Sequence, residues 1–146
     1  MKTRGINRVA IVVEDLDRAV ALYSELLSTT FHPLVLAEDW GVRAVFSYEA
    51  GIEIASPIPE SKELMALALA QHIKEHGEGL YAAVFSVDDV EQARAKAEEI
   101  GIQVLHKIEL DRDELNRSFQ DRYSSFIEYF LNPEDTCGAL VVLGQY

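Results

Sequence analysis

"GLYAAVFSVDDVEQARAKAEEIG", residues 79–101, repeats the pattern of "INRVAIVVEDLDRAVALYSELL", residues 6–27. Each stretch runs apolar residues into an acidic turn and then places apolar residues at helical spacing. Aligning Asp15 with Asp89 superposes the strand-like and helix-like parts of both stretches. Both aspartates are predicted N-caps, because a carboxylate can accept the unpaired N–H groups of a first helical turn. The repeat predicts an internal duplication, and each copy begins with a strand, a tight turn and a helix.

Each copy continues with short β-like runs separated by turn residues, and a helical pattern that ends at Gly77 connects the copies. The sequence therefore predicts an α+β fold of two βαβββ modules in a single domain, residues 1–146. The predicted strands that follow the first helix of each module are 31–37, 42–50 and 51–56 in the first, and 102–110, 124–131 and 138–145 in the second. The predicted boundaries are 5–57 for the first module, 58–78 for the connecting helix and 79–146 for the second module.

A charged insertion, residues 107–122, interrupts the second module. A long loop at such a place is often functional, for example as a lid over a site, but a solvated surface turn fits the composition equally well. Both interpretations stay open at this level.

Composition excludes several classes of protein. The formal net charge of -12 argues against nucleic acid as a partner, and more weakly against an anionic membrane surface. Cys137 is the only cysteine, so no intramolecular disulfide can form, which is typical of a reducing compartment. The apolar run 9–13 is too short for a signal peptide or a membrane span. We expect a soluble, cytoplasmic protein.

Four stretches carry a resemblance to a known family. The order and spacing of "VAIVVEDLDRAVALY" (9–23), "GIEIASP" (51–57), "HIKEHGEGL" (72–80) and "YFLNPEDTCGALVVL" (129–143) resemble the vicinal oxygen chelate superfamily, and within it the methylmalonyl-CoA epimerase branch. The resemblance implies that the paired modules form a cup-shaped, curled mixed sheet around a small-molecule site. It also implies a homodimer.

The same resemblance implies a divalent metal held by four residues, and this sequence departs from that pattern. The four corresponding positions are Arg8, Glu53, Ala82 and Val142. A guanidinium has no free lone pair, and alanine and valine have no donor atom. The sequence therefore predicts no metal and no other cofactor.

Two interpretations of Arg8 and Glu53 are near even. They form a buried ion pair in the space that the metal leaves, or Arg8 replaces the metal's charge and holds a carboxylate or enolate oxygen. In the second case Glu53 acts as a base or hydrogen-bond acceptor. Tyr129 is a further candidate, as a hydrogen-bond donor or general acid, and a purely structural core aromatic is the alternative role. The remaining predicted pocket residues are Ala10, Val12, Trp40, Tyr48, Val84, Ser86, Leu140 and Val142.

Two functions from different classes follow. The first is a metal-independent isomerase, epimerase or lyase-like enzyme that acts next to a carbonyl. The second is a non-catalytic protein that sequesters a hydrophobic or cationic small molecule, as bleomycin-resistance members of the superfamily do. The histidines add little to either, although His72 and His76 share one helical turn and such a pair can bind zinc. Solvated surface residues are the simpler interpretation of that pair.

Overall fold

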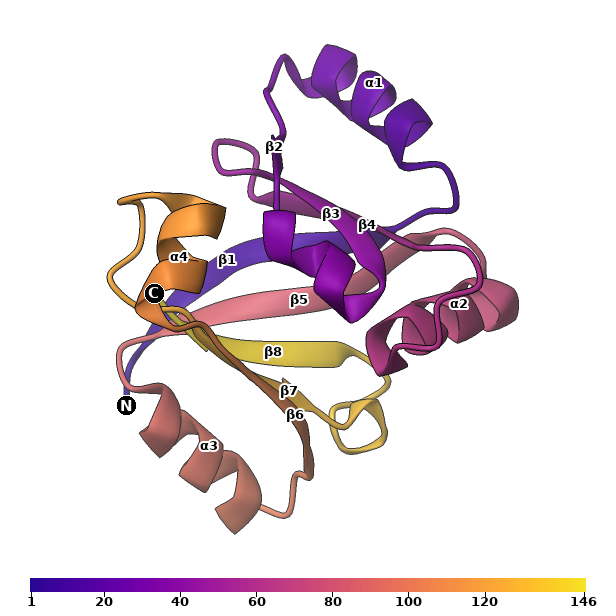
Figure 1. Cartoon of the computed structure of the whole chain (residues 1–146). Helices are drawn as coiled ribbons and strands as arrows, with labels where there is room; N and C mark the ends of the chain where they lie inside the picture. Colours follow the sequence, from indigo (N-terminus) through magenta and orange to yellow (C-terminus); the bar gives the residue numbers. More distant parts are fainter. The chain divides into compact units, whose positions relative to one another are not determined.

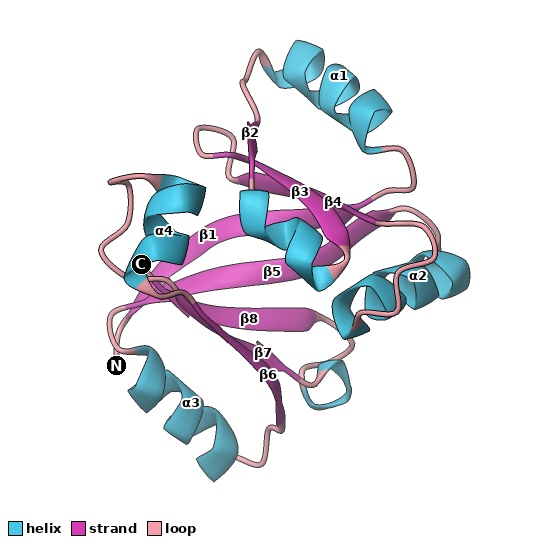
Figure 2. Ribbon diagram, in the orientation of Figure 1, coloured by secondary structure: helices cyan, strands magenta, loops and turns pink.

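The computed structural model describes Met1–Tyr146 and contains the two predicted βαβββ modules (Figure 1, Figure 2). Helix α2 (Leu64–His76) connects them. The first module comprises β1 (Thr3–Val12), α1 (Leu16–Leu27), β2 (His32–Pro33), the 3₁₀ helix η1 (Val35–Trp40), β3 (Val42–Ser47) and β4 (Ile52–Pro57). The second comprises β5 (Gly79–Val87), α3 (Val90–Glu99), β6 (Val104–Glu109), α4 (Arg112–Phe119), β7 (Ile127–Leu131), the 3₁₀ helix η2 (Pro133–Asp135) and β8 (Leu140–Gln145).

The chain divides into two compact units, and β1 contributes to both. The first unit is residues 9–81, and the second unit combines residues 1–8 with residues 82–146. The division falls directly after Arg8, so that this residue belongs with the second module in space although it lies in the first module of the sequence.

The two units have the same strand connections. In the first unit the Val9–Val12 part of β1 pairs in parallel with β4, which pairs antiparallel with β3, and β3 pairs antiparallel with β2. In the second unit β5 pairs in parallel with β8, which pairs antiparallel with β7, and β7 pairs antiparallel with β6. Each unit therefore contains one parallel strand pair followed by a series of antiparallel strands.

Strand register confirms the internal alignment of the sequence. Ala10 stands opposite Glu53 in the β1–β4 pair, and Val84 stands opposite Val142 in the β5–β8 pair. The alignment that superposes the two N-cap aspartates also superposes Ala10 on Val84. Glu53 and Val142 therefore occupy equivalent positions in the two modules.

The predicted helix caps are confirmed. The side chain of Asp15 accepts a hydrogen bond from the backbone N–H of Arg18 at 3.0 Å, and Asp89 accepts one from that of Gln92 at 2.9 Å. Gly77 ends α2 with a positive φ of 80°, as its position after the helical pattern predicts.

Each module packs its first helix on one face of its own strands. In the first unit the core on this face is Ile11, Val13, Leu16, Ala19 and Ile54. In the second unit it is Val87, Val90, Ala93 and Tyr129. Since side chains alternate along a strand, the neighbours of these strand residues point to the opposite face. No helix combines the length and the apolar composition that crossing a membrane requires.

Two predicted elements differ from the structure. The segment 31–37 forms only a two-residue strand, and the 3₁₀ helix η1 then occupies Val35–Trp40. The charged insertion is not a loop, because α4 forms within it. Asp111 and Glu114 make a reciprocal capping box at its start, and this arrangement stabilises a short polar helix.

Candidate functional site

A buried arginine is the centre of the polar network in the second unit. The side chain of Arg8, whose residue is 6 % exposed, lies on β1. Its Nη2 is 2.9 Å from Oε1 of Glu128. Its Nη1 donates hydrogen bonds to the hydroxyl of Tyr146 at 3.0 Å and to Oδ1 of Asn7 at 3.1 Å. Contacts on both terminal nitrogens hold the planar guanidinium in one orientation.

The partner carboxylate comes from the middle of the second module. Glu128 lies on β7, is only 2 % exposed, and points away from the α3 face. The hydroxyl of Tyr146 donates to the same Oε1 of Glu128 that faces Arg8, at 2.5 Å. Arg8, Glu128 and Tyr146 thus contact one another pairwise. A buried carboxylate that lies beside a cation and accepts a hydrogen bond from a hydroxyl meets the conditions under which burial of charge is tolerated.

Gly144 makes this arrangement possible. It stands opposite Glu128 in the β7–β8 pair, and Tyr146 follows it by two residues on the same strand side. A Cβ atom at position 144 would overlap the phenol ring of Tyr146. The ring therefore crosses the space above a residue without a side chain, and in this way its hydroxyl reaches Glu128.

Aromatic rings surround the network. Phe126 lies 5.1 Å from the ring of Tyr146 and 5.9 Å from the guanidinium carbon of Arg8. Tyr123 packs 5.2 Å from Tyr146, and Phe119 of α4 stacks on Phe126 at 4.9 Å. The insertion that contains α4 therefore provides part of the apolar wall around the ion pair, where electrostatic interactions are stronger than in water.

Burial fixes the protonation state of Tyr146. Desolvation raises the pKa of its hydroxyl strongly, and the adjacent carboxylate of Glu128 raises it further, against the opposing effect of Arg8. Tyr146 is therefore a neutral donor at physiological pH.

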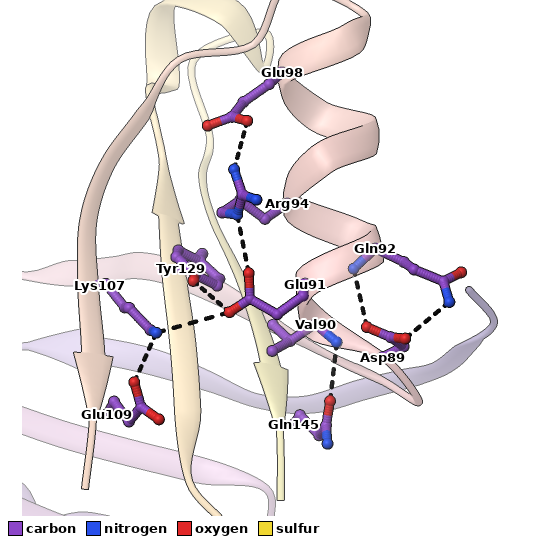
Figure 3. Close-up of polar contacts among 10 residues, drawn as sticks. All are labelled: Asp89, Val90, Glu91, Gln92, Arg94, Glu98, Lys107, Glu109, Tyr129 and Gln145. Atoms are coloured by element: carbon purple, nitrogen blue, oxygen red, sulfur yellow. Dashed lines mark hydrogen bonds and ion pairs between the residues drawn. The ribbon is translucent and has the colours of Figure 1, made fainter.

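The structure places Tyr129 elsewhere than predicted. It stands opposite Leu143, whereas its neighbour Glu128 stands opposite Gly144, so the two residues point to opposite faces of β7. Tyr129 packs under α3, and its hydroxyl donates to Oε1 of Glu91 at 2.6 Å (Figure 3). It does not share a face with Arg8, and Tyr146 supplies the hydroxyl beside Arg8 instead. The register of β7 against β8, which the sequence does not reveal, sets the face on which Tyr129 lies.

Glu91 is the centre of a second, exposed network on the α3 face. It lies 3.1 Å from Arg94 and 3.7 Å from the ammonium of Lys107 (Figure 3). The hydrogen bond from Tyr129 and then that from Arg94 lower the pKa of the Glu91 carboxyl. The Glu91 side chain is 53 % exposed, so water screens these charges.

Other predicted pocket residues of the second unit do lie on the face of Glu128. Val142 is opposite Val84, and Ser86 is opposite Gly144 on the other side of β8. Val142 is buried and Ser86 is partly exposed.

Several predicted site residues lie in the first unit. Val12 and Glu53 are on β1 and β4, on the face opposite the α1 core, and Glu53 stands opposite Ala10. Tyr48 follows β3 and stacks on His32 at 5.5 Å, and Trp40 ends η1 partly buried.

The second unit does not suit the divalent metal of the resemblance. The ligand positions that it contains are Arg8, Ala82 and Val142, and none of these side chains can donate a lone pair to a metal. Neither unit gathers three or more His, Cys, Asp or Glu side chains in a way that could hold an ion.

The duplicated βαβββ fold with its curled sheet is that of the glyoxalase-like class of proteins. The sequence model of the Glyoxalase/Bleomycin resistance protein/Dioxygenase superfamily matches residues 7–119, and the chain belongs to this superfamily. A search of curated protein sequences found no match.

Solved structures share the fold at low sequence identity. A hypothetical protein from Bacillus halodurans has a TM-score of 0.76 at 19 % identity, with 100 % of this chain and 96 % of that chain covered. Methylmalonyl-CoA epimerase from Mycobacterium tuberculosis has a TM-score of 0.75 at 20 % identity, covering 98 % and 88 %. A variant of the Streptomyces coelicolor epimerase in complex with 2-nitronate-propionyl-CoA has a TM-score of 0.75 at 24 % identity, covering 99 % and 98 %.

Sequence reasoning missed Glu128 and Tyr146. One signal was present, because Glu128 is the only charged residue between Ser124 and Leu131, in a run that otherwise reads as a buried strand. A lone acid in such a run needs a buried cation or donor as a partner. The position of Gly144, two residues before Tyr146, was a weaker signal for the role of this tyrosine.

Proposed function

We propose that this chain recognises a small carbonyl- or carboxylate-containing molecule through Arg8 and acts on it as an isomerase or epimerase without the usual divalent metal. The observation that carries the proposal is the fixed position of Arg8. The guanidinium is buried, and Glu128, Tyr146 and Asn7 hold it in one orientation. A preorganised donor of this kind can stabilise the charge that develops on an oxygen during proton abstraction next to a carbonyl.

The charge balance of the network bears on the kind of ligand. The carboxylate of Glu128 lies 2.9 Å from Arg8 and offsets positive charge there, and a guanidinium can hold a carbonyl that becomes an enolate as well as a carboxylate. A simple structural ion pair has the same geometry in the absence of ligand. The two roles are distinguished by whether substitution of Arg8 changes the binding of a ligand.

The relatives support a carbonyl substrate. Two of the structures with the same fold are methylmalonyl-CoA epimerases, and one of them holds 2-nitronate-propionyl-CoA. Acyl thioesters are therefore the first substrates to test, although the net charge of -12 disfavours a ligand with several phosphates. Glu53 is the proposed proton acceptor. Its equivalent in the second module is Val142, so we propose proton transfer at one carboxylate rather than two.

Proton exchange tests the enzymatic proposal directly. Chelator-treated protein is incubated in deuterated water with α-chiral carboxylic acids and their thioesters, and deuterium at the α-carbon is followed by NMR. We expect exchange with at least one substrate. Arg8→Met should abolish it, Glu53→Gln should slow it by about 100-fold or more, and Arg43→Met, which alters an exposed pair with Asp17, should leave it unchanged. Exchange that requires added metal would contradict metal independence, and exchange that survives Arg8→Met would contradict the role of Arg8.

A second candidate function has its own support. The aromatic rings of Phe119, Tyr123, Phe126 and Tyr146 form an apolar wall, and the acidic chain attracts cations. Both features suit a protein that sequesters a cationic or hydrophobic molecule. A rise in thermal stability with cationic antibiotics, lost in Tyr123→Ala and accompanied by no proton exchange, would favour this function over the enzyme.

We also propose, from superfamily membership, that the chain works as a homodimer in the cytoplasm on a small molecule. Analytical ultracentrifugation at micromolar concentration tests the assembly, and a single species at the mass of one chain would contradict it.

A further inference from the structure

Two histidines lie one helical turn apart on α2. The ring centroids of His72 and His76 are 4.8 Å apart, with 43° between the ring planes. The side chain of His76 is 64 % exposed, and His72 is half-buried. All the groups that contact this pair belong to the first unit.

The separation of the rings matches a shared metal ion. A metal lies about 2.0–2.1 Å from a ligating imidazole nitrogen, which places each ring centroid roughly 3.2 Å from the ion. Two such rings are then about 4.5 Å apart at a right angle between ligands and about 5.2 Å apart at a tetrahedral angle. The observed 4.8 Å lies between these limits.

The surroundings hold His72 in place. Its ring makes a T-shaped contact with the ring of Tyr81, with the ring centroids 4.8 Å apart. Because His72 is already ordered, binding an ion needs to order only the ring of His76.

A carboxylate beside the pair favours a cation. Oε2 of Glu75 lies 3.8 Å from Nε2 of His76, and Gln71 donates a hydrogen bond to the other oxygen of Glu75. No third His, Cys, Asp or Glu completes the set. Such a site therefore has two protein ligands and leaves its remaining positions to water.

We propose that His72 and His76 form a surface site for one divalent transition-metal ion. Two imidazoles suit Ni²⁺, Cu²⁺ and Zn²⁺, with Cu²⁺ bound most tightly. Mg²⁺ and Ca²⁺ prefer oxygen ligands and should not bind. This site is separate from the one proposed for catalysis, and its presence or absence does not bear on metal independence there.

The four histidines of the chain allow a matched experiment. NiCl₂, ZnCl₂ and MgCl₂ are titrated by calorimetry into chelator-treated protein that carries no added histidines, using the wild type, His72→Ala/His76→Ala and His32→Ala/His106→Ala. Each double variant removes two of the four histidines, and His32 and His106 are exposed, so both should fold. Circular dichroism verifies this.

The proposal predicts one Ni²⁺ or Zn²⁺ per wild-type chain and no response to Mg²⁺. The affinity should fall about tenfold or more in His72→Ala/His76→Ala, and it should be unchanged in His32→Ala/His106→Ala. Absence of saturable binding in the wild type would overturn the proposal. Equal weakening in both double variants, or unchanged binding in His72→Ala/His76→Ala, would overturn it as well.

Discussion

Glu128 and Tyr129 are neighbours on β7, and each belongs to a network of one carboxylate, one tyrosine hydroxyl and basic side chains. On one face, Glu128 accepts from Tyr146 and pairs with Arg8. On the other, Tyr129 donates to Glu91, beside Lys107 and Arg94. The chemical groups are nearly the same, but the first network is buried and the second is mostly in water.

The difference in burial separates their energetic roles. Removing one partner of a buried ion pair leaves an uncompensated charge, whereas exposed pairs contribute little because water already solvates them. We therefore expect the Arg8 network to be sensitive to every change and the Glu91 network to tolerate substitution. The predictions below test this contrast.

The largest expected effect is that of removing the buried carboxylate. Glu128→Ala should lower the free energy of unfolding by about 3 kcal/mol, because Arg8 loses the carboxylate at 2.9 Å. Glu91→Ala should lower it by less than about 1 kcal/mol. Urea denaturation measures both variants. Similar losses in the two would remove the distinction between the networks.

A methyl group at position 144 should displace Tyr146. Gly144→Ala puts a Cβ where the phenol ring lies, and we expect a loss of about 2 kcal/mol from the displaced ring and its hydrogen bonds. The same change in a Tyr146→Ala background should cost much less, because the ring is absent. Additive effects in this double-mutant cycle would show that the ring of Tyr146 does not require a residue without a side chain at position 144.

The two tyrosine hydroxyls provide a closely matched pair. Tyr146→Phe should cost about 1.5–2 kcal/mol, since its hydroxyl bonds to two charged groups out of water. Tyr129→Phe should cost about 0.5–1 kcal/mol, because its partner Glu91 is solvated. Chemical denaturation at neutral pH compares them, and a larger loss for Tyr129→Phe would reverse the assignment of the buried network.

The smallest effect is expected in the pH dependence of stability. The pKa of Tyr146 is raised above its ordinary value of 10.0, so the folded chain keeps this proton after the unfolded chain has released it. Its contribution is therefore complete below pH 10 and decreases as the pH rises above 10. Burial and Glu91 also raise the pKa of Tyr129. Denaturation between pH 8 and 10.5 should show a flatter decline for Tyr146→Phe than for Tyr129→Phe, and equal slopes would contradict the stronger perturbation of Tyr146.

Much of the fold was predictable because it depends on local patterns. The duplicated strand–turn–helix units, the caps Asp15 and Asp89 and the stop at Gly77 all lie within a few residues of the elements they define. Helix α4 was predictable by the same means, since Asp111 and Glu114 have capping-box spacing, but its high charge favoured a loop interpretation. The short β2 was not predictable, because a strand of two residues depends on its partner β3 rather than on its own pattern.

The candidate site was predictable only in part. Arg8 and the absence of metal-ligand chemistry at positions 82 and 142 follow from carrying the ligand positions of the resembling superfamily onto this sequence. The contact between Arg8 and Glu128 does not, because the two residues are 120 apart in the sequence and no local pattern connects them. The faces that Glu128 and Tyr129 occupy do not follow from the sequence either, because a shift of one residue reverses the face of every side chain on a strand, and the register is set by pairing across the sheet.

The sequence by itself therefore determined the duplicated architecture, the helix boundaries and the loss of ligand types, because each depends on residue chemistry and short-range spacing. Only the tertiary structure decided which face each residue of β7 occupies, that Glu128 lies against Arg8, and that Tyr146 reaches across Gly144 to join them. Strand register and burial are properties of the assembled sheet. They turn similar groups into a buried network at Arg8 and a solvated one at Glu91.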